Sequence, residues 1–561
     1  MAARSHNWRL YGFIVAVIST IIALHGRAMA QLPPTGQGVA TRLGTVAAPV
    51  YQAAPARTIF ATAAELAAAS RATLEEAEVP AVPLVANPEG PPPGTETAFT
   101  ARAQSQVIAQ PEAAGDFATF QFSSPSSVIS STFKSTVEEP STGMAGRVMF
   151  MTGNWWAAFS NNSGTTWTAL SPFSQFPSAD GGFCCDQTVL YEPSRDMMFW
   201  LLQYIKSGSA STSRGRERLA IYRNTSNNIG PSGWIFHDFL PSSFGGPTSG
   251  EWFDYPHLAL TTNYVYMTVN VFSTTTNRWT RTVIARFPLD PLRAGTSFSY
   301  NYLSWTANFN FTAVQGAKNV MYWASHNSNT SIRIFQWPEN TTSVTHFDVT
   351  VPAWNTTAHH CPTTNDRFDW CSFSDNRILA AVRTVKQPFG TSAAPTPNSQ
   401  SELWFFWNVG AGGSFPKPYI EGARFNESTK ANDRRPLLWS SSVALHYPGG
   451  AANIRGDIAL SVFVAAGAGA DPSGLLCLAD DYTSDPPGWS CPRYVAFGTN
   501  GPNNNRWGDF VDVRPNWPSG FGWQATSFVL SGGSGTGFAV PYNIVFGRSR
   551  DANSNVRWQL K

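Results

Sequence analysis

The stretch SNNSGTTW, from Ser160 to Trp167, has the composition of a tight β-hairpin turn followed by a large aromatic residue. A short polar side chain such as that of Asn162 can cap a turn of this kind. Gly164 can adopt the positive φ that the turn requires, and Trp167 can pack between neighbouring units. These roles are structural, so the stretch bears on architecture and leaves the chemistry open.

The same pattern recurs along the chain. SNNIGPSGW, from Ser226 to Trp234, repeats it 66 residues later with one inserted residue. SDPPGW, from Ser484 to Trp489, ends on the same Pro-x-Gly-Trp, and its Trp lies 255 residues after Trp234. That distance is close to four steps of about 64 residues, which suits radially repeated four-stranded units. The recurrence predicts an all-β fold of the β-propeller class.

A second repeated signal runs in phase with the first. Each of four aspartates opens a run with β-branched or aromatic residues, and these are Asp186, Asp254, Asp369 and Asp509. The successive gaps of 68, 115 and 140 residues correspond to one, two and two repeats. We therefore predict seven blades, at about 118–172, 183–240, 251–303, 306–351, 366–421, 437–497 and 506–560. Six blades is the alternative, if the first or last unit is incomplete and is shared across the ring closure.

The composition agrees with this fold class. Only 13% of the residues are charged, whereas the average for soluble proteins is about 25%, and the chain contains 45 Gly, 40 Pro and 21 Trp. Many turns and few amphipathic helices are expected. The formal net charge is +2, so no strong field points to nucleic acid or to an anionic membrane surface as a partner.

The N-terminus has the pattern of an export signal. Arg4 and Arg9 precede the apolar run 11–24, and Ala28-Met29-Ala30 supplies a site for signal peptidase before Gln31. An uncleaved membrane anchor is the alternative reading of the same run. We expect a signal peptide at 1–30, a disordered linker or pro-segment rich in Ala and Pro at 31–115, and a propeller at 116–561. The mature protein would then be secreted, to the periplasm or the exterior, with no membrane attachment after cleavage.

Export makes the six cysteines candidates for disulfides. Cys361 and Cys371 bracket a short loop, as do Cys477 and Cys491, so local pairing is the simplest of the connectivities that six cysteines permit. Cys184 and Cys185 are adjacent in the sequence, and we expect them to form a vicinal disulfide beside Asp186. Metal binding by the cysteines is disfavoured, because no Cys-x-x-Cys pair accompanies them.

Four passages carry a resemblance to a known family: TGNWWAAFSNNSGTTW, GGFCCDQTVLYEPSRDMMFWLLQY, FDYPHLAL and RWGDF. Over roughly 146–550 the chain resembles bacterial secreted sialidase-like propellers with BNR (Asp-box) repeats, with Asn162 where the Asp of the box usually stands. The resemblance implies a propeller that handles carbohydrate or glycoconjugates. The Arg-Ile-Pro motif of true sialidases is absent, so a typical sialidase activity is not implied.

The four aspartates are the candidate catalytic residues. The first strand of each propeller blade lines the central channel, so Asp186, Asp254, Asp369 and Asp509 are expected to converge at one mouth of it. Such a ring could supply the two carboxyl groups of a glycoside hydrolase, or it could equally hold a hard cation such as Ca²⁺. The structural alternative is that each Asp caps the start of its own strand. No other cofactor is indicated.

Charged and aromatic residues near these strand starts are the candidate substrate-binding residues. They are Glu251, Trp252, Arg367, Trp370, Arg506 and Trp507, although aromatic residues at such positions often pack between blades instead. Two functions fit the pattern: a secreted glycoside hydrolase, or a non-catalytic propeller that binds glycans or proteins. A hydrolase requires two carboxyl groups about 5 to 9.5 Å apart, whereas a binding protein requires no such pair.

Overall fold

The computed structural model describes residues 36–51, 64–65, 67–68, 80–84, 88–92, 95–97, 117–134, 137–363, 368–385, 400–466, 471–480, 489–502, 505–532 and 538–552. The expected signal peptide at 1–30 lies outside these residues. No helix in this described part of the chain is long and apolar enough to cross a membrane.

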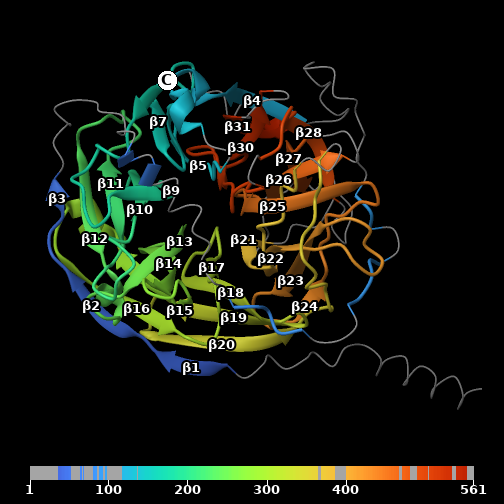
Figure 1. Cartoon of the computed structure of the whole chain (residues 1–561), viewed down its shortest axis with the longest axis horizontal. Helices are drawn as coiled ribbons and strands as arrows, with labels where there is room; N and C mark the ends of the chain where they lie inside the picture. The colour runs from blue at the N-terminus through green and yellow to red at the C-terminus, as the bar shows by residue number, and fades with distance from the viewer. Residues whose placement is uncertain are drawn as a thin grey trace, which may run out of the picture.

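The described strands form seven antiparallel sheets arranged as the blades of a propeller (Figure 1). We number the blades in chain order. Blade 1 contains β5 (Ser141–Ala145), β6 (Val148–Gly153), β7 (Trp156–Ser160) and β8 (Thr168–Leu170). Blade 2 contains β9 (Phe183–Glu192), β10 (Met197–Tyr204), β11 (Arg216–Arg223) and β12 (Trp234–Phe239). Blade 3 contains β13 (Glu251–Leu260), β14 (Tyr264–Ser273), β15 (Trp279–Pro288) and β16 (Phe298–Trp305).

The remaining blades follow the same order. Blade 4 contains β17 (Thr312–Ala313), β18 (Val320–Ser328), β19 (Ser331–Pro338) and β20 (Ser343–Thr350). Blade 5 contains β21 (Ile378–Val385), β22 (Ser401–Val409), β23 (Tyr419–Asn426) and β24 (Asn432–Arg434). Blade 6 contains β25 (Val443–Ala452), β26 (Ile458–Ala466), β27 (Ser473–Ala479) and β28 (Ser490–Ala496). Blade 7 contains β29 (Val513–Pro515), β30 (Trp523–Ser531), β31 (Phe538–Arg548) and β4 (Phe117–Ser123).

The described helices are short. They are α3 (Leu289–Ala294) and the 3-10 turns at Pro125–Ser127, Ser131–Phe133, Pro241–Phe244 and Ser549–Asp551. The predicted fold class and the count of seven blades are therefore confirmed.

Apolar clusters between neighbouring blades make up the core. The strand MMFWLLQY of β10 is buried along its whole length, because its two faces pack against two different neighbours. Its Trp200 contacts Phe150 of blade 1, with ring centroids 5.0 Å apart, while Phe199 joins a cluster with Phe253 of blade 3. The continuous apolar runs of the sequence thus reflect sheets that are covered on both faces.

The ring is closed by a strand from the start of the propeller. β4 pairs antiparallel with β31 as the outermost strand of blade 7 (Figure 1). The unit expected at 118–172 is therefore corrected: residues 117–123 belong to the last blade, and blade 1 begins at Ser141. The sequence shows only repeats that follow one another along the chain, whereas ring closure pairs a strand from the start of the propeller with strands from its end.

We expect Phe117→Ala to destabilise the whole propeller. Phe117 is 1% exposed and lies 5.8 Å from the ring of Phe546. Loss of a buried Phe costs about 3 to 5 kcal/mol in denaturant unfolding. Phe122→Ala is the matched control on the same strand, because Phe122 is 44% exposed, and it should cost about 1 kcal/mol or less. Equal losses for the two variants would contradict the closure role of β4.

The segment before β4 contributes strands to three blades. β1 (Gln37–Ala40) pairs with β20, β2 (Arg42–Val46) with β16, and β3 (Val50–Tyr51) with β12. In Figure 1 these blue strands lie along the outer edges of blades 4, 3 and 2. Part of the segment expected to be a spacer is therefore strand, because the outer edges of the blades offer unpaired backbone groups.

The turn SNNSGTTW, from Ser160 to Trp167, lies between β7 and β8. The backbone N–H of Gly164 donates to Ser160 Oγ at 2.8 Å, and that of Thr166 donates to Asn162 Oδ1 at 2.9 Å. Gly164 has a φ of +73° and Trp167 is buried. The related stretch before Trp234 lies between β11 and β12, the equivalent position of blade 2. Both turns therefore have the structural role expected of them.

Candidate functional site

The strand starts of several blades surround a cavity of about 600 Å³. Asp186 and Asp254 each occupy the fourth position of a ten-residue innermost strand, β9 and β13. Asp509 precedes β29, and all three side chains line the cavity. Repeated strand starts thus bring carboxyl groups from blades 2, 3 and 7 into one space.

Asp369 is not among the residues that line this cavity. Its Oδ1 accepts the backbone N–H of Cys361 at 2.7 Å, and its Oδ2 lies 2.5 Å from Nδ1 of His360. These contacts hold together the loop between Cys361 and Cys371, so the role of Asp369 is structural but lies in a loop and not at the start of a strand. The catalytic role of the other three aspartates stays a prediction.

Some of the candidate substrate-binding residues line the cavity, and others have structural contacts elsewhere. Trp252 and Arg506 line the cavity. Glu251 instead forms an ion pair with Arg281, whose Nη2 lies 2.6 Å from its Oε2. Trp370 and Trp507 are buried against each other with ring centroids 5.7 Å apart. Arg367 lies outside the described residues.

Sequence reasoning missed four charged residues of the cavity, namely Glu139, Lys206, Asp375 and Arg377. Glu139 precedes β5, whose sequence STGMA has no aromatic residue and only one β-branched residue. The pattern of an acidic residue followed by β-branched or aromatic residues therefore does not identify it. Asp375 precedes β21 by three residues and is the acidic residue near the start of that strand. Asp369 was chosen instead because Trp370 follows it, but residues 370–373 form a turn. An acidic residue a few positions before each inner strand is the signal that would have found both.

Glu139 and Asp186 form a buried carboxyl pair. Burial, followed by the charge of Asp509, raises the pKa of Glu139 to about 7. Burial, followed by the charge of Glu139, raises the pKa of Asp186 well above its usual range. The charge of one carboxylate therefore disfavours ionisation of the other. The cavity therefore holds a carboxyl group that stays protonated up to about neutral pH.

Arg377 provides a partly buried positive charge in the cavity wall. Its Nη2 lies 2.7 Å from Asp375 Oδ2, and its Nη1 lies 3.8 Å from Asp509 Oδ2. The guanidinium also lies 4.3 Å from the ring centroid of Tyr255. Burial alone would raise the pKa of Asp375, but the adjacent guanidinium outweighs it and holds that pKa below the ordinary value. Asp375 and Asp509 are thus the two cavity carboxyl groups that face this cation.

The three expected disulfides are present, and one of them forms part of the cavity wall. Cys184 and Cys185 are bonded to each other, and both line the cavity next to Asp186. The other two bonds join Cys361 to Cys371 and Cys477 to Cys491. The vicinal bond places an apolar disulfide beside the candidate carboxyl pair.

Peptide mapping of the unreduced protein is expected to recover Cys184 and Cys185 in one peptide that carries an internal disulfide. The Cys361–Cys371 bond is the internal control, because tryptic cleavage after Arg367 leaves two peptides that the disulfide joins. A peptide in which Cys184 or Cys185 is linked to any of the other four cysteines would contradict the vicinal bond.

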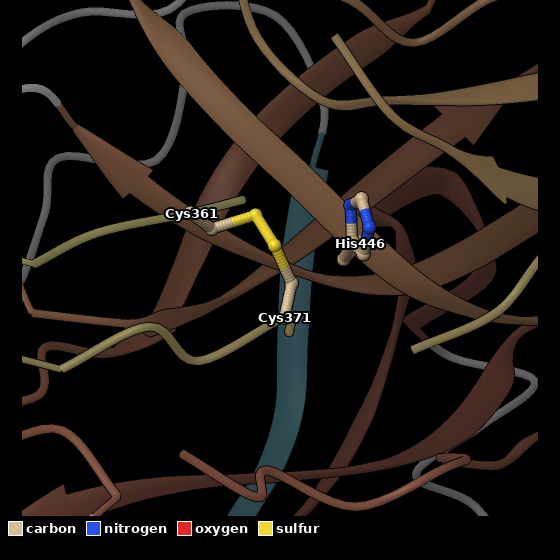
Figure 2. Close-up of side chains that lie close together, drawn as sticks. All are labelled: Cys361, Cys371 and His446. Atoms are coloured by element: carbon tan, nitrogen blue, oxygen red, sulfur yellow. A yellow bond between two sulfur atoms is a disulfide. The ribbon is translucent and has the colours of Figure 1, made fainter. Parts of the chain in front are cut away.

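One group of potential metal ligands occurs among the described residues. Cys361, Cys371 and His446 offer ligand atoms within 4.8 Å of one another. Figure 2 shows that the two sulfur atoms are bonded to each other beside the imidazole, so neither is available as a thiolate. The carboxyl groups of the cavity do not form such a group among the described residues, so the Ca²⁺ alternative gains no donor set from them.

No family model matches the chain, and no curated protein matches it. Among solved structures, the chain is similar to Trypanosoma rangeli sialidase in complex with sialic acid, with 9% identity, a TM-score of 0.35, and coverage of 74% of this chain and 60% of that chain. The chain thus spans about 60% of the length of that sialidase.

Two arabinan-degrading enzymes are also similar. An α-L-arabinofuranosidase from Fusarium graminearum shows 10% identity, a TM-score of 0.34, and coverage of 78% of this chain and 99% of that chain. A Penicillium chrysogenum α-L-arabinanase complexed with arabinobiose shows 11% identity, a TM-score of 0.34, and coverage of 78% and 98%.

Proposed function

We propose that this protein is a secreted glycoside hydrolase whose reaction takes place in the central cavity. The observation that carries the proposal is the convergence of carboxyl groups in the cavity: a buried pair with raised pKa values, Glu139 and Asp186, and a third carboxyl group, Asp509, 3.8 Å from Arg377. Glycoside hydrolysis uses one protonated and one ionised carboxyl group on either side of the scissile bond. The buried pair can supply the protonated group, and Asp509 is assigned the other role because it lies beside a cation.

In this proposal the Glu139–Asp186 pair is the general acid. A group with a pKa of about 7 retains a proton at neutral pH and can give it to the leaving oxygen. Asp509 is the nucleophile, or the base that activates water, and Arg377 holds its charge in place. Asp254 also lines the cavity and would contact the sugar.

The walls of the cavity suit a sugar ring. Trp252, Phe272, Phe309 and Phe373 line it, and the rings of Trp252 and Phe272 lie 5.3 Å apart. Aromatic faces pack well against the C–H face of a pyranose or furanose. Phe373 is 38% exposed and lies 5.2 Å below the guanidinium of Arg506, which places an aromatic and a cationic group where the cavity meets solvent.

Export supports a substrate outside the cytoplasm. Three disulfides in one chain are typical of oxidising compartments. Polysaccharides and glycoconjugates of the exterior or periplasm are the matching partners.

A hydrolysis screen of the mature protein tests the proposal. The panel consists of 4-nitrophenyl glycosides of common pyranoses and of α-L-arabinofuranose, a fluorogenic sialoside, and polysaccharides assayed for reducing ends. Release of sugar from at least one substrate is the expected result. Binding on a glycan array without any release would favour the non-catalytic binding propeller, and the absence of both would overturn a carbohydrate function.

A further inference from the structure

A second buried carboxyl group lies behind the cavity. Glu217, in β11, has no exposed surface, and neither of its carboxyl oxygens has a hydrogen-bonding partner among the described residues. Leaving a buried carboxylate without a partner is very unfavourable, whereas a neutral carboxylic acid requires only an acceptor for its proton. The site does not use Glu217 directly, because its side chain does not line the cavity.

An acceptor is available on the neighbouring strand. Gln203 of β10 lies directly opposite Glu217 in the antiparallel register, so the two side chains extend from the same face of the sheet. Gln203 is also buried, and its Oε1 has no partner among the described residues. These oxygens belong to cross-strand neighbours and have no partner among the described residues, so a proton on Glu217 would satisfy both groups together.

The orientation of the Gln203 amide is fixed by its other contacts. Nε2 donates to the backbone carbonyl of Phe253 at 3.0 Å and to Asp254 Oδ1 at 3.3 Å. Rotating the amide would place Oε1 against these two acceptors. The amide nitrogen therefore faces blade 3, which leaves Oε1 free for Glu217.

We infer that Glu217 is a permanently protonated positioning residue, which donates its proton to Gln203 Oε1 and thereby holds the Gln203 amide on Asp254. This inference rests on the proposed function, because Asp254 is one of the carboxyl groups of the proposed active site. Glu217 itself touches no substrate in this arrangement.

The charges around Glu217 support a neutral side chain. The cationic neighbours on β11, Arg216 and Arg218, extend from the opposite face of the strand and pair with Asp180 and Asp238. The groups that face Glu217 are acidic, namely Asp254 and Asp186. Burial, followed by the charge of Asp254, raises the pKa of Glu217 well above its usual range.

Two variants of the mature protein separate positioning from mere packing. Glu217→Gln keeps a donor for Gln203 Oε1 and has no ionisable proton, while Glu217→Leu fills similar space without a donor. The first readout is isotope-edited infrared spectroscopy at neutral pH, in which the wild-type minus variant difference spectrum should show a neutral carboxyl band for both variants, because the bands of other protonated carboxyl groups cancel. The second is kcat on the glycoside that the wild-type protein cleaves best in the screen. Because Gln can still orient the amide, Glu217→Gln should retain kcat within a few-fold, whereas Glu217→Leu should lower it roughly 10- to 100-fold and shift its pH profile.

Each outcome decides one statement. If the wild-type minus Glu217→Gln difference spectrum shows no neutral carboxyl band, or if the Leu and Gln variants share one kcat and one pH profile, the positioning role is overturned. If the wild-type protein cleaves no substrate of the screen, the proposed function fails instead, and the infrared result still decides whether Glu217 is protonated. Crystal structures of the two variants then decide the positioning, since the Gln203 amide should leave Asp254 in the Leu variant only.

Discussion

Asp509→Asn is expected to abolish glycoside turnover while leaving the fold intact. Asp509 lines the cavity and faces Arg377, so its charge is the one that the proposed reaction uses as nucleophile or base. Removing such a group lowers kcat by roughly 10²- to 10⁴-fold. Asn has nearly the same size, so the melting temperature should change little. Steady-state kinetics and thermal unfolding of the same preparation provide the two measurements.

Asp369→Asn is the matched control for this prediction. Asp369 was selected by the same sequence pattern but does not line the cavity, and Asn retains an acceptor for the N–H of Cys361. Its kcat should stay at the wild-type value. A large loss of stability in Asp509→Asn with intact turnover would instead assign Asp509 a strand-capping role.

The protonated pair sets the expected pH dependence. The pKa of Glu139 is raised to about 7, so the acid form is present below that pH and is lost as the pH rises through it. The kcat of the wild-type protein should therefore fall on the alkaline side of neutrality.

Arg377→Met is expected to lower both stability and turnover. The substitution leaves the partly buried Asp375 without its cation and removes the neighbour of Asp509. Loss of the pair should cost about 1 to 3 kcal/mol, between the values for exposed and for fully buried ion pairs. Denaturant unfolding at several pH values measures the loss, and turnover should fall with it.

The sign of the pH dependence follows from Asp375. In the wild-type protein its pKa lies below 3.8, so this carboxylate stabilises the fold above that pH, and the contribution is lost as the pH falls. In the variant the guanidinium no longer lowers this pKa, so the pKa rises and the stability that the carboxylate provides above that pH shrinks. The difference between the two proteins should therefore be small in acid and should grow toward neutral pH.

Arg333→Met provides the control for a more exposed ion pair. Arg333 bonds Asp348, whose side chain is 44% exposed, so the loss should be about 1 kcal/mol or less and nearly independent of pH. Equal losses of stability in Arg377→Met and Arg333→Met would contradict a larger contribution from the less exposed pair of Arg377 and Asp375.

Several features of the fold and the site could be predicted from the sequence because their causes are local. Asn162, Gly164 and Trp167 encode a turn through the preferences of single residues, and their recurrence revealed the repeat. Asp186 and Asp254 were found because equivalent strands begin with equivalent residues. The vicinal bond of Cys184 and Cys185 followed from adjacency, which leaves little choice of partner once the other cysteines pair locally.

Other features depend on segments that meet only in the folded chain. Phe117 closes blade 7 because the two ends of the propeller come together there, and no periodicity along the chain encodes that junction. Asp369 has the same local sequence pattern as Asp254, but its carboxylate accepts the backbone N–H of Cys361 and contacts His360 within a loop, so it does not line the cavity. The sequence by itself determined the repeat, the turns and three of the cavity carboxyl groups, Asp186, Asp254 and Asp509, because these follow from local residue preferences. Only the tertiary structure decided that Glu139, Arg377 and Glu217 belong with them, because burial and charge at each carboxyl group depend on neighbours from other blades and strands.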